Sequence, residues 1–118
     1  MNANEILEYC LAEKNGVEET FPFNPDTLVL KVGGKMFLLM SLEKQPLSIA
    51  VKTDPEWSAE LREQYPQING AYHMNKTHWN SVICEGLKRE LIVNLIEHSY
   101  ELVLKALPKK IREEVLNS

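Results

Sequence analysis

The chain has few of the residues and motifs that mark disulfide-linked, zinc-binding, secreted and membrane proteins. It contains only two cysteines, Cys10 and Cys84, too few for a disulfide framework or a four-ligand structural zinc site. We expect both to be reduced core residues. No apolar run is long enough to cross a bilayer, and the first residues lack the basic-then-apolar pattern of a signal peptide. These absences predict a cytoplasmic protein without a membrane segment.

Motifs of catalysis and nucleotide binding are also missing. The sequence has no Gly-x-Ser-x-Gly elbow, Walker motif, dinucleotide fingerprint or paired-carboxylate motif. Cys84 follows an apolar run, which favours an inert thiol. His73 and His78 lack the i, i+4 spacing that places two imidazoles on one helix face. We expect no enzyme, metal site or cofactor; an enzyme that uses His73, His78 or Cys84 is the lowest-ranked alternative.

Positive charge is scarce as well. The chain has 13 Lys and Arg against 17 Asp and Glu, a net charge of −4. Residues 1–27 hold six acidic residues and one lysine, a net −5, so residues 28–118 carry the other +1. A nucleic-acid-binding domain is usually basic on one face. The charge therefore predicts that any DNA binding is weak and sensitive to salt.

The overall composition is that of one globular domain. With 118 residues, 44% hydrophobic and 25% charged, the chain can bury a core without disulfide or metal staples. It has no internal repeat, linker or low-complexity segment. We expect a single domain over residues 1–118.

Helical periodicity predicts a first helix over residues 2–13, with Asn2 and Glu5 as a capping box. Residues 17–27 are expected to be irregular because two prolines interrupt them. Phe21 and Phe23 are expected to hold this loop on the core, and the alternative is an aromatic pair that faces a ligand.

Residues 28–32 and 35–40 read as a β-hairpin joined by Gly33-Gly34. Simple alternation pairs Val32 with Lys35 and Leu30 with Phe37. It places Leu28, Leu30, Val32, Phe37 and Leu39 on one face, and Val29, Lys31, Met36, Leu38 and Met40 on the other. Since both faces carry apolar residues, we expect the hairpin in the middle of its sheet.

The remaining elements are a strand over 47–53, a helix over about 54–64, strands over 70–74 and 79–84 joined by a turn, and a long helix over 88–107. Pro108 then breaks that helix or opens a short final one. This order predicts an α+β fold, with a mostly antiparallel sheet and helices packed on one face.

Residues 70–82, which we call the wing, concentrate side chains that stack, donate and accept hydrogen bonds. Aromatic rings can stack on bases, cationic groups meet phosphates, and amides reach base edges. The alternative is that the aromatics are core residues and the polar side chains satisfy a tight turn. The candidate DNA-binding residues are Tyr72, His73, Asn75, Lys76, His78, Trp79 and Asn80.

Several blocks of the sequence resemble the MmcQ/YjbR family. They are residues 25–29 (PDTLV), 31–37 (KVGGKMF), 72–80 (YHMNKTHWN), 98–103 (HSYELV) and 107–110 (LPKK). The blocks stand in order across nearly the whole chain; the family commonly has glycine where Asn24 stands. The resemblance implies a CyaY-like, double-wing α+β fold in a bacterial cytoplasmic protein described as DNA-binding. It supplies no catalytic or base-reading residue.

Two functions follow as expectations. The first is a monomeric DNA-binding protein that uses the wing. The second is a protein- or small-ligand-interaction module with no nucleic-acid role, suggested by the negative net charge and the acidic first helix.

Overall fold

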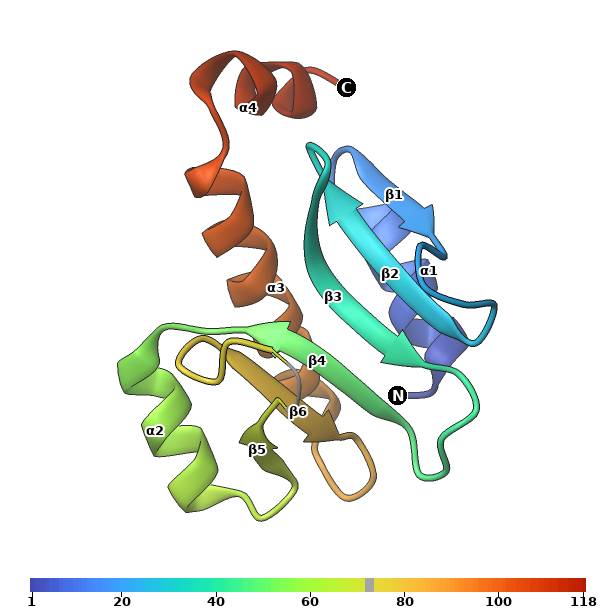
Figure 1. The fold of residues 1–118 in the computed structure, drawn as a ribbon, viewed down its shortest axis with the longest axis vertical. Helices are drawn as coiled ribbons and strands as arrows, with labels where there is room; N and C mark the ends of the chain where they lie inside the picture. Colours follow the sequence, from blue (N-terminus) through green and yellow to red (C-terminus); the bar gives the residue numbers. More distant parts are fainter. Residues whose placement is uncertain (72–73) are drawn as a thin grey trace.

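One six-stranded antiparallel sheet and four helices make up the described part of the chain (Figure 1). The computed structural model describes residues 1–71 and 74–118. The strands, in the sheet order β1-β2-β3-β4-β6-β5, are β1 Val17–Thr20, β2 Thr27–Val32, β3 Lys35–Ser41, β4 Ser48–Lys52, β6 Trp79–Ile83 and β5 Ile68–Gly70. The helices are α1 Ala3–Glu13, α2 Pro55–Gln64, α3 Arg89–Ala106 and α4 Lys109–Leu116. The predicted α+β class is confirmed.

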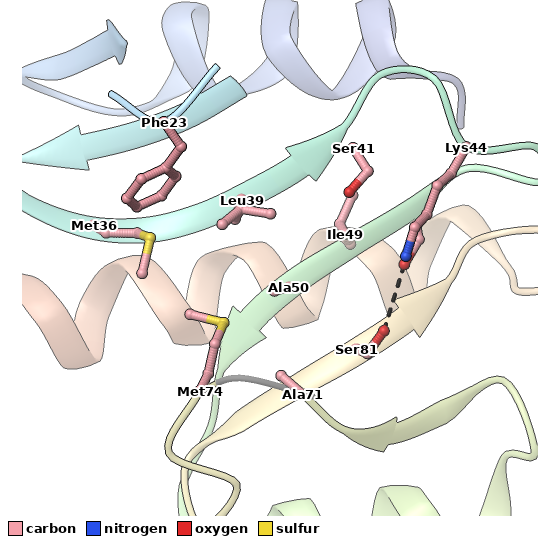
Figure 2. Close-up of a pocket in the computed structure, with 11 residues that line it drawn as sticks. Phe23, Met36, Leu39, Ser41, Lys44, Ile49, Ala50, Ala71, Met74 and Ser81 are labelled. Carbon is pink, nitrogen blue, oxygen red and sulfur yellow. Dashed lines mark hydrogen bonds between the residues drawn. The ribbon is translucent and has the colours of Figure 1, made fainter. Parts of the chain in front are cut away.

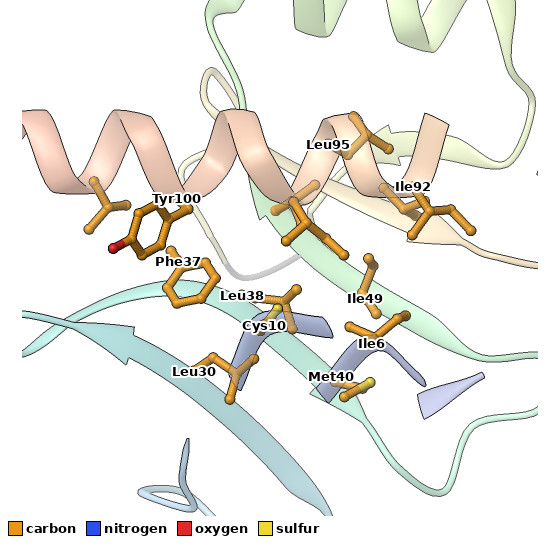
Figure 3. Close-up of a cluster of buried hydrophobic side chains, with 14 of the residues drawn as sticks. Ile6, Cys10, Leu30, Phe37, Leu38, Met40, Ile49, Ile92, Leu95 and Tyr100 are labelled. Carbon is orange, nitrogen blue, oxygen red and sulfur yellow. The ribbon is translucent and has the colours of Figure 1, made fainter. Parts of the chain in front are cut away.

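The core lies between the sheet and the helices α1 and α3, which cover one of its faces (Figures 1 and 3). The apolar stripe of α3 is buried through Ile92, Leu95 and Ile96. In Figure 3 the ring of Phe37 lies beside that of Tyr100, edge to face with centroids 5.3 Å apart. None of the helices in the described ranges is long and apolar enough to span a membrane.

The β2–β3 turn has the predicted geometry. Gly33 and Gly34 both have positive φ, 56° and 81°, and Val32 pairs with Lys35 as expected. A Cβ atom on Gly33 would lie 2.6 Å from a methyl carbon of Leu107, so a larger residue here would also have to displace this side chain at the α3–α4 junction.

Beyond the turn, the predicted register of the hairpin is wrong because β3 contains a β-bulge. Lys31 pairs with Met36, but Leu30 pairs with Leu38, which leaves Phe37 as an extra residue on β3. Phe37 and Leu38 are consecutive and both are fully buried. The alternation therefore shifts by one, and Leu39 lies on the face opposite the core together with Met36.

The bulge is tied to α3 by Ser99, which is fully buried. Its hydroxyl donates a hydrogen bond to the carbonyl of Phe37 and accepts one, at 2.8 Å, from the amide of Lys52 on β4. Regular β3–β4 pairing ends just before this point, at Leu38 and Val51. Ser99 thus satisfies two backbone groups that the diverging strands leave without a ladder partner.

A polar cluster joins α1 to α3. The Glu97 carboxylate accepts a hydrogen bond from the Tyr9 hydroxyl and forms an ion pair with Lys14. Burial raises the pKa of Glu97, but the bonds from Lys14 and Tyr9 outweigh burial and bring it below its ordinary value. Burial and then the contact with Glu97 raise the pKa of Tyr9 to about 12.

Three other expectations need correction. Residues 17–20 form the edge strand β1 against β2 rather than an irregular segment, because the prolines start only at Pro22. Phe21 and Phe23 are 48% and 67% exposed, so they do not hold their loop on the core. Strand β5 spans residues 68–70 instead of 70–74, whereas residues 72–73 of the predicted strand lie outside the described residues.

Replacing Ser99 with alanine tests the role of the bulge contact. Ser99→Ala removes both hydrogen bonds and leaves the buried carbonyl of Phe37 and the half-buried amide of Lys52 without these partners. We expect a loss of about 1–3 kcal/mol in the free energy of unfolding, measured by urea denaturation. The control is Asn94→Ala at an exposed position of the same helix. Equal stability of the two variants would contradict the proposed role of Ser99.

Candidate functional site

The tip of the wing is formed by a tight turn. Asn75, Lys76 and Thr77 are exposed there. The side-chain oxygen of Asn75 accepts a hydrogen bond of 3.0 Å from the backbone amide of Thr77. The backbone carbonyl of Asn75 accepts hydrogen bonds from the backbone amides of His78 and Trp79. Tyr72 and His73 of the predicted site lie outside the described residues. The exposed tip therefore presents Asn75 and Lys76 of the predicted DNA-binding residues, together with Thr77.

Asn80 does not reach a base edge, which corrects the prediction made for it. The residue is fully buried. Its side-chain amide donates 2.7 Å to the hydroxyl of Thr53 and 3.3 Å to that of Ser58. Its side-chain oxygen accepts 2.9 Å from Nε of Arg62. All the hydrogen-bonding capacity of this amide is directed inward, so Asn80 is a structural residue.

Arg62 is the residue that sequence reasoning missed in this network. It lies on α2, and its guanidinium also donates to the carbonyls of Lys76 and Trp79. One side chain thus bonds both ends of the wing turn and the buried Asn80. Arginine can do this because its donors form a rigid planar fork. A sequence pattern carries little signal for such a contact, since an arginine on an amphipathic helix usually faces water.

His78 and Trp79 are half-buried. The carbonyl of His78 accepts a 2.7 Å hydrogen bond from the amide of Thr53, which holds the wing against the end of β4. Trp79 pairs with Lys52 in the sheet. By strand alternation, Trp79 lies on the same face as Ser81, opposite the core. His78 and Trp79 therefore lie next to the wing tip but are less exposed to solvent than the tip residues.

A pocket of about 600 Å³ lies on the sheet face opposite α1 and α3, which we call the open face (Figure 2). Its apolar part consists of side chains from β3, β4, the Phe23 loop and the wing. In Figure 2, Phe23, Met36, Leu39 and Met74 gather at one end of the hollow, with α3 behind the sheet. The described residues that line the pocket are Phe23, Met36, Leu39, Ser41, Lys44, Ser48, Ile49, Ala50, Ala71, Met74 and Ser81.

The other end of the pocket is polar. Ser41 pairs with Ser48 across β3 and β4, and the hydroxyls of Ser48 and Ser81 are 3.4 Å apart. Lys44, on the loop after β3, adds an ammonium group at this end (Figure 2). The pocket therefore has an apolar end and an end with three hydroxyls and one positive charge.

The sequence contained a partial signal for this pocket. The second apolar face of the 28–40 hairpin requires a covering group, and a ligand-facing role for Phe21 and Phe23 is one of the two predicted alternatives. Simple alternation places Leu39 on the face of Leu28, Leu30 and Phe37, opposite Met36, and the bulge at Phe37 puts Leu39 on the face of Met36 instead. Ser48 and Ala50 are small residues two positions apart in the predicted strand over 47–53, but nothing in the sequence shows what lies opposite them.

The two cysteines lie in the core as free thiols. Cys10 and Cys84 are free and buried, and burial raises their pKa values to about 12 and about 11. Such thiols are protonated at neutral pH and are poor nucleophiles. Within residues 1–71 and 74–118, no group of three or more His, Cys, Asp or Glu side chains is placed to hold a metal ion.

Comparison with known proteins gives one consistent family. The YjbR family model matches residues 12–102. The chain is 40% identical to the uncharacterised protein YbdF of Escherichia coli O157:H7, over 84% of this chain and 82% of that protein. It is 30% identical to the uncharacterised protein YjbR of Escherichia coli K12, over 96% of each chain.

Solved structures of similar proteins have the same fold. The crystal structure of Deinococcus radiodurans protein DR2400, with family-model domain DUF419, has a TM-score of 0.89 and 38% identity, and covers 98% of this chain and 88% of that one. The crystal structure of a protein from Pseudomonas syringae has a TM-score of 0.74 and 30% sequence identity to this chain. The match covers 87% of this chain and 99% of that protein's chain.

Two asparagines of the wing make a matched test of the buried network. Asn80→Ala leaves Arg62 and two buried hydroxyls without their shared partner, so we expect it to cost about 1–3 kcal/mol of unfolding free energy. Asn75→Ala, at the exposed tip, is expected to cost less than about 1 kcal/mol. Urea denaturation of both variants measures the difference. Equal losses would contradict the structural role assigned to Asn80.

Proposed function

This chain belongs to the YjbR family, and we propose that it is a binding module that takes a small, mainly apolar organic ligand in the pocket of the open face. The observation that carries the proposal is the apolar end of the pocket, where Met36, Leu39 and Met74 meet Phe23 (Figure 2). This is a role in binding and not in catalysis.

The size and the lining of the pocket support this function. Small-molecule sites commonly have volumes of about 300–1,000 Å³ and are lined by apolar side chains with a few polar groups. The present pocket falls in this range at about 600 Å³. Phe23 is 67% exposed although it is a large aromatic residue, and a ligand in the pocket would cover part of its ring.

The side chains at the apolar end suit ligand binding for a further reason. Met36 and Met74 are unbranched thioethers that adjust to differently shaped apolar partners. They come from β3 and from the wing, so a ligand between them would contact two segments that are far apart in the sequence. Both are partly exposed, in contrast to Met40, which is fully buried in the core.

Methyl NMR of the methionines tests this function directly. The probe is octanamide, a neutral molecule with an apolar chain. We expect it to shift the methyl signals of Met36 and Met74 in a saturable manner because both line the pocket. Met40 is in the core and Met1 lies outside the pocket, so their signals serve as internal controls.

Variants of the pocket floor complete the test. Ala50→Leu adds bulk to the floor and is expected to weaken octanamide binding at least about fivefold, a change of about 1 kcal/mol. The control is Ile83→Ala. Ile83 lies on the same face of β6 as Ser81 but does not line the pocket. Absence of saturable shifts, or equal shifts at all four methionines, would contradict the function.

Duplex DNA is the second candidate partner. The exposed tip formed by Asn75, Lys76 and Thr77 favours it, as does the neighbouring pair of Lys52 and Trp79. The net charge of −4 and the burial of Asn80 count against tight or sequence-specific binding. For these reasons DNA ranks below the small ligand.

The DNA candidate makes its own prediction. A short duplex titrated at low salt should shift backbone amide signals at residues 74–79, and the shifts should weaken at physiological salt because phosphate contacts release counterions. Lys76→Ala and Trp79→Ala should each reduce the affinity, with Lys110→Ala on α4 as the control lysine. If neither variant changes the affinity, the wing is not the DNA site.

A further inference from the structure

We propose that the ligand of the open-face pocket is an amphipathic carboxylate, whose acidic group lies at the serine end and whose apolar body lies at the methionine end. This inference deepens the proposed function and rests on it. It follows from the unequal distribution of polar groups along the pocket (Figure 2).

The polar end offers hydrogen-bond donors from three different strands. Ser41, Ser48 and Ser81 come from β3, β4 and β6. Ser41 pairs with Ser48, and the hydroxyl of Ser81 is 3.4 Å from that of Ser48. A hydroxyl can rotate its proton towards an acceptor. The 3.4 Å contact is at the long limit for a hydrogen bond, so little is lost when these two hydroxyls turn to a ligand.

The formal charge at this end is positive. Lys44 is the charged residue among the described residues that line the pocket, and none of them is Asp or Glu. A carboxylate would gain a charge-assisted contact from Lys44 together with hydrogen bonds from the hydroxyls. An amine ligand would instead meet an ammonium group without a neighbouring carboxylate in the lining.

The opposite end has no comparable donors. Phe23, Met36, Leu39 and Met74 supply ring, thioether and aliphatic surface. Such a surface favours a hydrocarbon or aromatic body, because burying apolar area contributes about 25 cal/mol per Å². The two ends together specify a molecule with one acidic group and an apolar body, and do not favour a uniformly polar metabolite.

Octanoate and octanamide form a matched pair of probes for this inference. They share the same chain length, but only octanoate carries a negative charge. We expect octanoate to bind about fivefold more tightly than octanamide at low salt, because its carboxylate gains one exposed ion pair with hydrogen bonds. The affinities come from titrations of the Met36 and Met74 methyl signals.

Two variants locate the acidic group. Lys44→Met keeps an unbranched chain of nearly the same length without the ammonium group. It should bring the ratio of the two affinities close to one, with octanamide binding unchanged. Ser81→Ala should lower the ratio in the same direction. Lys110→Met on α4, an exposed lysine outside the pocket lining, should leave the ratio unchanged.

The outcomes separate this inference from the proposed function. Binding of neither probe overturns both. Equal binding of octanoate and octanamide leaves the pocket as a ligand site and overturns the carboxylate. A preference for octanoate that survives Lys44→Met, or that Lys110→Met removes equally, overturns the placement of the acidic group. A preference that Lys44→Met removes, Ser81→Ala lowers and Lys110→Met leaves unchanged supports the full proposal.

Discussion

The bulge at Phe37, fastened to α3 by the hydroxyl of Ser99, is the constraint on which the rest of the structure depends. The extra residue lets Phe37 and Leu38 both enter the core, where each is fully buried. It also shifts the following alternation, so that Leu39 joins Met36 on the open face. The bulge therefore places two apolar side chains in the core on one side of β3 and contributes to the apolar end of the pocket on the other side.

A second polar contact positions the other wall of the pocket. The wing contributes Met74 and Ala71 to the lining, and its turn is fixed to α2 by Arg62 and to the end of β4 through Thr53. Buried Asn80 joins these contacts. A fully hydrogen-bonded polar network of this kind favours a single conformation, because leaving any buried polar group in it without a partner would cost free energy. The pocket thus lies between the bulged strand β3 and the hydrogen-bonded turn at residues 75–79, and its exposed ring, Phe23, comes from a loop.

The predictable parts of this fold are those specified by local sequence. The capping box of Asn2 and Glu5, the Gly33-Gly34 turn and the long stripe of α3 were all anticipated, and the structure confirms them. The bulge was not predictable, because its carbonyl is satisfied by a serine 62 residues further along the chain. The inward direction of Asn80 likewise depends on Arg62, which is distant in sequence. The pocket was missed for the same reason: its lining follows from the bulge, and its serines meet only when β3, β4 and β6 are paired.

Intermolecular NOEs between the protein and bound octanoate test the central claim most directly, since they place the ligand on the surface without relying on affinities. NOEs are expected from the terminal methyl of octanoate to the methyls of Met36 and Met74. NOEs are also expected from the methylene next to the carboxylate to the Cβ protons of Ser48 and Ser81. The reverse orientation would contradict the assignment of the acidic end, and NOEs to any other surface would contradict the open-face pocket as the functional site.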